Sequence, residues 1–295
     1  MKILSLLDTF LFAPDRDVRV GRLFRVVLAA QLFVEFLLLT PSWLRYYGDP
    51  PISEHLYSNL FSISNSPFYL YGVLCVGLIA CLALAAGRWV RLSVLILFVI
   101  QRSMVLQSPV IVNGHDYVFT VLLFCALGMP LGGAPSSNSH HLTVRTIFGS
   151  ILARRLAQVL FVFMYLSTGL AKPLDDVHWR DGSAMSWIVL STRWSSFPNA
   201  SFLTDPYVSM ALTYYTLAVE LLAPLLIWFS RFRLAMIVAI CSLHAGIIML
   251  MDSCILLFNT GSITWALLFA KDEDLDSFTR WLRKSGLRCR RLIKK

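Results

Sequence analysis

Ionisable side chains stand inside several long apolar runs of this sequence, where a charge is costly unless it faces a cavity or another polar group. Glu220 is the most informative because it lies in the middle of the run 217–224. It either pairs with a neighbour such as Arg102 or His244 and so fixes helix packing, or it takes part in proton transfer. His244 is either a packed, hydrogen-bonded histidine or a supporting site residue. Five residues of this kind occur: Glu35, Arg102, Glu220, His244 and Asp252.

A second set of polar residues lies at the edges of apolar runs. An Asn-Gly turn signal at 113–114 places His115 and Asp116 at the start of one run. Lys172 stands where another run ends, and Pro173 is expected to stop that helix because proline lacks a backbone donor. These spacings bring an amine and an imidazole to the ends of two neighbouring apolar segments.

Lys172 and His115 together could carry out proton transfer. A lysine amine held in a dry pocket can lose its proton at neutral pH, because burial disfavours the charged form. A neutral amine can then act as a general base, and His115 could share the proton or orient a substrate oxygen. The alternative is that Lys172 only extends its charged end outward from an apolar helix.

The composition excludes a water-soluble protein. Hydrophobic residues make up 57% of the 295 positions, 15% are charged, and the mean hydropathy is +0.67, whereas soluble domains carry about 25% charged residues. The net charge of +9 would suit nucleic acid, but the basic residues lie in short loops between apolar runs, which is typical of membrane proteins. We therefore expect a lipid bilayer as partner, and no nucleic acid.

The six cysteines occur without a CxxC pair, and most of them lie in apolar runs. This spacing favours neither a disulfide framework nor a zinc site. The cysteines are expected to be small packing residues, and the sequence predicts no metal site.

Eight apolar segments approach the ~20 residues that a helix needs to cross a bilayer. The fourth, seventh and eighth are short, so the number of spans could fall by one or two, or short pieces could be re-entrant. We predict an all-α bundle of about eight transmembrane helices over residues 1–270, followed by a basic tail at 271–295. The segments are 22–41, 68–87, 90–108, 116–132, 152–171, 207–229, 233–251 and 254–270.

Most of the 26 Lys and Arg residues lie on one side of these segments, which predicts that this side and both termini are cytoplasmic. His115 and Lys172 then lie on the outer face. We expect an integral, multi-pass protein of a bacterial inner or cell membrane. The stretch 3–12 and the tail 272–295 are predicted to be interfacial helices, the tail on anionic lipid. A solvated tail that only anchors the topology is the alternative.

Two stretches resemble the horizontally transferred transmembrane (HTTM) family, which includes vitamin K-dependent γ-glutamyl carboxylase. They are SPVIVNGHDYVFTVLLFCALGMPL at 108–131 and YLSTGLAKPLDDVHWRDGSAM at 165–185. The hexapeptide RYYGDP at 45–50 and the segment that begins at His244 add to the similarity, which extends over about residues 15–270. Short proteins of the sporulation-delaying protein B type, which are implicated in maturing a secreted peptide toxin, are similar too.

The resemblance implies that Lys172 is the catalytic base that deprotonates vitamin K hydroquinone and that His115 is the active-site histidine. It implies a site that opens on the extracytoplasmic side, with a reduced quinone as cofactor. Two departures lie beside these residues: Gly114 replaces an asparagine of the family, and Pro173 changes the spacing after the lysine. The residues expected to support the site are Asp116, Glu220, Asn113, His244 and Arg102.

Two functions of different classes fit these observations. The first is an intramembrane enzyme that modifies a small molecule or a secreted peptide with a quinol, in a lyase reaction like that of the carboxylase. The second is a non-catalytic maturation, immunity or scaffold component of a peptide-export or toxin system. A transporter is disfavoured because the sequence shows no two halves with repeated broken helices.

Overall fold

The described part of the chain is almost entirely helical. The computed structural model describes residues 10–11, 17–48, 59–107, 114–131, 151–191, 195, 201–251, 256–280 and 283. Within these ranges the one extended feature is an isolated antiparallel bridge between Ser195 and Met251. The predicted all-α class is therefore confirmed for the described residues.

Eight principal helices correspond to the eight apolar segments predicted from the sequence. Short helices and 3₁₀ turns connect some of them, and a further helical stretch covers 272–280. The principal helices are α2 (Val18–Leu39), α4 (Pro67–Ala86), α5 (Val90–Gln107), α6 (Gly114–Gly128), α7 (Leu152–Asp175), α10 (Pro206–Leu226), α11 (Ser230–Leu250) and α12 (Leu256–Ala266). The short elements are η1 (Thr40–Ser42), α3 (Trp43–Tyr47), η2 (Leu60–Ser62), α8 (Val177–Asp181), α9 (Ala184–Leu190), η3 (Ser201–Thr204) and η5 (Leu267–Phe269).

Six of the described helices are long and apolar enough to cross a membrane: α2 with its extension to Tyr47, α4, α5, α7, α10 and α11. The seventh segment was expected to be short, but α11 has 21 residues. Helices α6 and α12 have 15 and 11 residues, so α6 is about 22 Å long at 1.5 Å per residue. That length falls short of a ~30 Å hydrocarbon core. The described residues thus form six long helices and two shorter ones, and the shorter ones are the fourth and eighth of the predicted segments.

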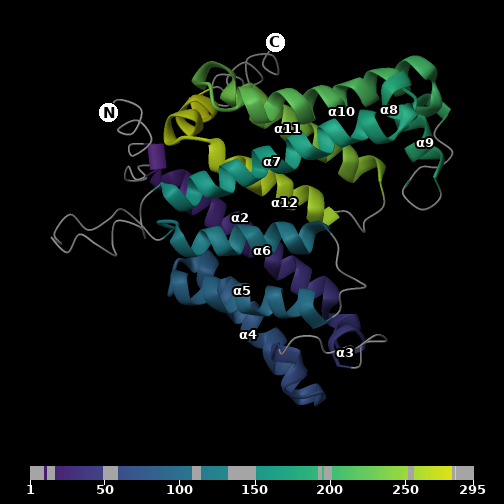
Figure 1. Cartoon of the computed structure of the whole chain (residues 1–295). Helices are drawn as coiled ribbons and strands as arrows, with labels where there is room; N and C mark the ends of the chain where they lie inside the picture. Colours follow the sequence, from purple (N-terminus) through teal and green to yellow (C-terminus); the bar gives the residue numbers. More distant parts are fainter. Residues whose placement is uncertain are drawn as a thin grey trace, which may run out of the picture.

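The helices pack as two groups that share a central junction. In one group α2 packs on α4, α4 on α5 and α5 on α6; in the other, α7 packs on α10, α10 on α11, and α12 on both α11 and α7. Contacts of α6 with α7, and of α12 with α6 and α2, join the groups. Figure 1 shows α6 and α12 in the middle, between α4 and α5 on one side and α10 and α11 on the other. The two short helices therefore lie where longer helices surround them.

The outward faces of the long helices are apolar. Only 28–50% of each candidate span is buried inside the protein. Large side chains such as Phe68, Ile79 and Phe163 are exposed at 91%, 64% and 71%. Water would not tolerate so much contiguous apolar surface, which is the property that a lipid-contacting bundle needs.

Local sequence signals explain several helix ends. Helix α4 begins with Pro67 in its first turn and ends at Gly87, whose positive φ of 73° suits a left-handed cap. Helix α10 begins after Asp205, whose carboxylate accepts hydrogen bonds from the backbone of Tyr207 and Val208. The prediction that Pro173 stops its helix is wrong, because α7 continues to Asp175. Proline has no backbone N–H and so removes one helical hydrogen bond. Only two helical residues follow Pro173, so the loss affects only the last turn of α7.

A buried arginine joins three elements at the end of the bundle where α2 begins. Arg154, in the first turn of α7, is 4% exposed. Its guanidinium donates to the carbonyl oxygens of Leu268 and Ala270, at 2.7 and 2.5 Å, and to Asp17 at 3.1 Å. Arg154 is thus an internal packing residue at this end of the bundle.

The acidic start of the tail docks on the same end. The carboxylate of Asp276 accepts from the Arg19 guanidinium at 2.7 Å, and Asp272 accepts from the backbone of Val20 at 3.0 Å. Asp274 pairs with Arg233 at 2.8 Å. The start of α2, the start of α11 and the 272–280 helix therefore lie together. Residues 3–9 and 12, part of the predicted N-terminal interfacial helix, and most of the tail beyond 280 lie outside the described residues.

Candidate functional site

The first polar group of interest joins α7 to α10 near the end of the bundle that carries α8 and α9. Lys172 Nζ donates a hydrogen bond to Glu220 Oε1. The lysine side chain is 27% exposed and the carboxylate side chain 11%. The amine therefore reaches the edge of the bundle while its partner stays inside. Glu220 Oε2 is buried without a hydrogen-bond partner among the described residues.

A small residue and an aromatic ring shape this pair. At Gly169, one turn before Lys172, an added Cβ would lie 3.0 Å from Leu221 and 3.1 Å from the Cβ of Glu220. Glycine thus permits α7 and α10 to approach closely. On the other side, Lys172 Nζ lies 4.8 Å from the centroid of the Trp179 ring, a cation–π distance. The amine is bounded by a carboxylate and a flat indole.

Hydrogen bonds within the short α8–α9 segment hold the region around Trp179. His178 Nδ1 lies 2.8 Å from Ser183 Oγ, and the Ser183 hydroxyl donates to Asp181 at 2.6 Å. The hydroxyl and the backbone N–H of Ser183 both donate to Asp181 and hold the pKa of this carboxyl below its usual value. The serine donates to the acid rather than to the histidine, so the trio lacks the arrangement of a catalytic triad and serves to fix the turn.

A chain of three polar side chains lies beside the lysine pair. Tyr165 on α7 hydrogen-bonds through its hydroxyl to His244 Nε2 on α11, and His244 Nδ1 lies 2.6 Å from Asn259 Oδ1 on α12. All three are buried. This chain joins α7, α11 and α12, whereas the Lys172–Glu220 pair joins α7 to α10.

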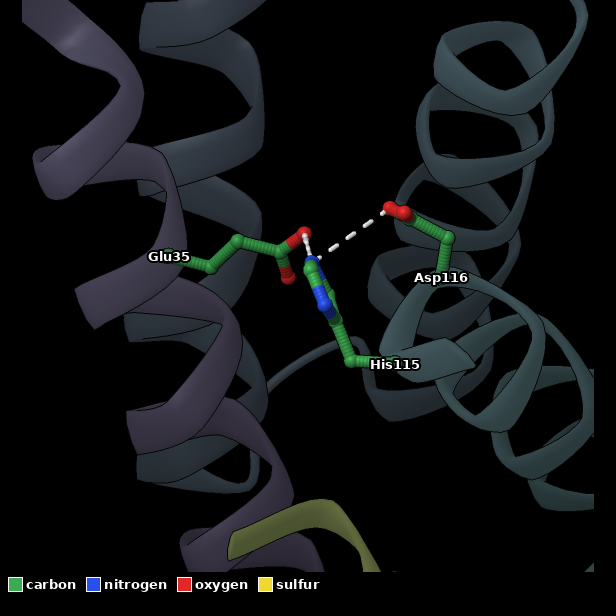
Figure 2. A group of neighbouring side chains, drawn as sticks. All are labelled: Glu35, His115 and Asp116. Carbon is green, nitrogen blue, oxygen red and sulfur yellow. Dashed lines mark ion pairs between the residues drawn. The ribbon is translucent and has the colours of Figure 1, made fainter. Parts of the chain in front are cut away.

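The second polar group joins α2, α5 and α6. His115 Nε2 lies 3.7 Å from Glu35 Oε1 and 3.7 Å from Asp116 Oδ1. Figure 2 shows the imidazole of His115 between the two carboxylates, with Glu35 reaching it from the facing helix. Gln101 Nε2 on α5 donates to the same two oxygens, at 3.3 and 3.1 Å. Because Gly114 begins α6, the helix start delivers His115 and Asp116 to this point.

This second group, here named the acid–histidine cluster (Glu35, Gln101, His115 and Asp116), is deeply buried. Glu35 and Gln101 are 0% exposed, and Asp116 is 7% exposed. Three of its buried polar atoms have no hydrogen-bond partner among the described residues: Glu35 Oε2, Gln101 Oε1 and His115 Nδ1. Buried polar groups normally form hydrogen bonds. The three unpartnered atoms could therefore bind a further ligand.

His115 and Lys172 belong to different groups of contacts, one on α2, α5 and α6, the other on the four later helices. Phe258 on α12 borders both regions: it lies 3.0 Å from the position of an added Cβ at Gly114, and its ring centroid is 6.5 Å from that of His244. Convergence of Lys172 and His115 on one substrate stays a prediction.

The other residues predicted for the site have mixed outcomes. Glu220 is buried and has a polar partner, as predicted, but that partner is Lys172 and neither of the two examples named, Arg102 and His244. Arg102 is exposed. Helical periodicity explains the error, because Arg102 follows the buried Gln101 and points away from it. Asn113 and Asp252 lie outside the described residues.

Sequence reasoning missed four residues of these networks: Gln101, Tyr165, Trp179 and Asn259. Gln101 and Asn259 were visible as uncharged polar residues within apolar segments, which is the signal that could have found them. The sequence marks Glu35 as an ionisable residue in an apolar run but names no partner for it. Its contacts with Gln101 on α5 and His115 on α6 depend on how the helices pack, which sequence periodicity does not reveal.

Comparisons with protein-family models, with curated proteins and with solved structures find no match to this chain. The class that the structure defines is an all-helical protein with six described helices long and apolar enough to cross a membrane. The HTTM resemblance stays a hypothesis drawn from the residues themselves.

Proposed function

We propose that this chain is a multi-pass membrane protein of the HTTM, carboxylase-like type that acts as an intramembrane enzyme. It takes a proton from a small molecule or a secreted peptide at an outward-facing site, with a reduced quinone as the proton donor that fits best. The observation that carries the proposal is the hydrogen-bonded pair of Lys172 and Glu220, half open at its lysine end and buried at its carboxylate end.

In the proposed reaction the amine of Lys172 is the general base, and Glu220 is the group that first takes the proton from its ammonium form. Glu220 can accept a proton from the ammonium group of Lys172, which leaves a neutral amine at the edge of the bundle. That amine can then take the hydroxyl proton of an acidic substrate. No bond other than O–H and N–H changes in this step.

Trp179 suits a planar substrate. Its ring lies 4.8 Å from Lys172 Nζ, so an aromatic ring stacked on or beside the indole would present its hydroxyl to the amine. Offset or edge-on aromatic pairs contribute about 0.5–1.5 kcal/mol beyond burial. A naphthohydroquinone has the required flat ring and acidic hydroxyl.

The test uses full-length protein in lipid nanodiscs and a reduced 1,4-naphthoquinone as substrate. The hydroquinone anion reacts with dissolved oxygen faster than the neutral hydroquinone does, giving quinone and hydrogen peroxide, so proton removal is read from the ultraviolet spectrum. Wild type should accelerate this oxidation. Lys172→Arg should lose roughly 100-fold or more of that acceleration, because a guanidinium stays protonated in proteins. Lys271→Arg, an exposed lysine at the other end of the bundle, is the matched control.

The second candidate function, a non-catalytic maturation, immunity or scaffold component, is favoured by one observation. The charges of Lys172 and Glu220 satisfy each other across α7 and α10, which is what an ion pair that only fixes helix packing would do. Under this alternative Lys172→Arg retains the pair and behaves as wild type. Equal oxidation rates for wild type, Lys172→Arg and empty nanodiscs would remove the enzymatic proposal and leave the scaffold.

A further inference from the structure

The acid–histidine cluster has a property that the proton-transfer proposal does not use. Glu35, His115 and Asp116 each offer one ligand atom, and these atoms lie within 4.8 Å of one another. We propose that the three residues bind one divalent transition-metal ion between α2 and α6. The proposal stands apart from the proposed function, because it concerns another group of helices and another measurement.

The geometry is close to that of a three-ligand metal site. Zinc and similar ions bond imidazole nitrogen and carboxylate oxygen at about 2.0–2.2 Å, so two ligands of one ion lie at most about 4.4 Å apart. His115 Nε2 is already 3.7 Å from an oxygen of each acid. At a tetrahedral ion such ligand atoms lie about 3.4 Å apart, so the widest separation, at most 4.8 Å, must close by up to about 1.4 Å. Binding of the ion therefore requires the carboxylate side chains to rotate toward the imidazole.

Charge supplies the second reason. Two carboxylates share a region in which Glu35 is 0% and Asp116 7% exposed, and burying a charge is costly unless it is paired or coordinates a metal. A divalent cation would balance two carboxylates. Glu35 Oε2, which has no hydrogen-bond partner among the described residues, gives the ion a further oxygen. This open, fully buried oxygen is the observation that separates the cluster from an ordinary group of acids.

Gln101 fits the role of a residue that orients ligands. Its amide nitrogen donates to one oxygen of Glu35 and one of Asp116, at 3.3 and 3.1 Å, and so holds the two carboxylates facing the imidazole. Such outer contacts typically change metal affinity 10–100-fold. Gln101 is therefore a positioning residue, whose replacement should weaken binding without removing a ligand.

The donor set selects the class of ion. One imidazole with two carboxylates suits zinc, manganese or ferrous iron, whereas soft copper(I) prefers thiolate or thioether and calcium prefers oxygen alone. Three protein ligands leave at least one coordination position open, as in catalytic zinc sites. The cysteine pattern gave no hint of this site because the cluster contains no cysteine.

The experiment measures metal content of the tag-free, full-length protein in detergent. The protein is stripped with a chelator, incubated with Zn²⁺ or Mn²⁺ alone, freed of excess ion and analysed by mass spectrometry for metal per chain. Wild type should hold one ion. Glu35→Gln and Asp116→Asn should lower affinity at least 100-fold, and Gln101→Leu 10–100-fold. Glu220→Gln, a buried carboxylate of the other network, is the matched control and should keep one ion.

A second measurement needs no variant. The electron spin-echo spectrum of the Mn²⁺-loaded wild type should show coupling to one imidazole nitrogen, that of His115. A folded wild type that retains no Zn²⁺ or Mn²⁺, or an ion that shows no nitrogen coupling, overturns the proposal and leaves a shared proton to balance the two acids. Quinone oxidation is not part of either readout, so each proposal can fail without the other.

Discussion

Glu35 and Glu220 are both carboxylates buried in helices, yet their neighbours differ. Glu220 meets the amine of Lys172, whereas Glu35 meets an amide, an imidazole and a second carboxylate. An acid beside an amine can exchange a proton with it, and an acid beside another acid needs a cation or a proton for balance. The two residues therefore lead to two different proposals, although the sequence shows each simply as a glutamate in an apolar run.

Removal of the Tyr165 hydroxyl should destabilise the bundle. In Tyr165→Phe the buried Nε2 of His244 loses its partner, and an unsatisfied buried polar group costs about 1–3 kcal/mol. The free energy of unfolding, measured by titration of detergent-solubilised protein with sodium dodecyl sulfate, should fall by that amount.

Tyr215→Phe is the matched control for this change. The Tyr215 hydroxyl also bonds across α10 and α11, to Ala239 and Ser242, but the side chain is exposed. Its loss should cost less than about 1 kcal/mol. Equal losses for the two variants would show that the Tyr165–His244 contact contributes nothing special to stability.

At the scale of elements, the contact between α7 and α10 controls the lysine pair. The two helices approach at Gly169, one turn before Lys172 and opposite Glu220. Helix α7 runs on through Pro173 to Asp175, and α8 begins two residues later with the segment that carries Trp179. A change in the separation of α7 and α10 would therefore alter the pair and its distance from the indole.

Gly169→Ala should destabilise the protein by about 1–3 kcal/mol, because the added Cβ overpacks against the Cβ of Glu220. Gly246→Ala in α11 is the matched control: nothing lies within 4 Å of its added Cβ, so helix propensity should stabilise the protein by up to about 1 kcal/mol. The same detergent titration measures both. Equal signs for the two substitutions would contradict the close approach of α7 and α10.

At the scale of the whole molecule, the start of α2 and the 272–280 helix meet at one end. Figure 1 shows α3, α8 and α9 at the opposite end from the start of α2. Lys172 precedes α8 closely in the chain and Glu35 lies near the end of α2, so both candidate sites belong to the half of the bundle away from the docked tail. An outward-facing site requires that this half face the outside.

A labelling experiment decides that orientation. Single cysteines are introduced at the exposed positions Arg180 and Arg88 in a background without native cysteine, and intact cells are treated with a membrane-impermeant maleimide. If the predicted topology with cytoplasmic termini holds, position 180 reacts and position 88 reacts only after lysis. The reverse labelling pattern would mean that the protein has the opposite orientation in the membrane, with Lys172 on the cytoplasmic side.

The docking of the tail should weaken in acid. Asp276 lies outside the membrane-spanning helices, and the hydrogen bond from Arg19 lowers the pKa of its carboxyl. Because the folded pKa is lowered, this contact contributes fully above the ordinary value near 3.9 and is lost as the pH falls through the lowered value. The pair is exposed, so high salt should weaken it too.

Spin labels at positions 22 and 279 would report this change as a longer distance at low pH. Asp276→Asn should show the longer distance already at neutral pH, and acid should change it little further. A distance that stays constant with pH in the wild type would mean that Asp272 and Asp274 hold the tail without Asp276.

The apolar segments and their helical state could be predicted from the sequence, because a bilayer demands about 20 apolar residues per span and a helix that satisfies its own backbone. The same pattern marked Lys172, His115 and Glu220, since a polar group in an apolar run is visible without neighbours. Turn and capping residues such as Asp205 and Gly87 also acted locally.

Only the tertiary structure decided which of these groups meet. Sequence spacing fixes the height of a side chain along its helix, but the lateral order of the helices determines its neighbours. That order pairs Glu220 with Lys172 instead of Arg102, and it places His115 against Glu35, 80 positions earlier in the chain. It also puts the short helices α6 and α12 at the junction of the two groups. Side-chain packing between helices selects this arrangement, and no local pattern in a single segment carries that information.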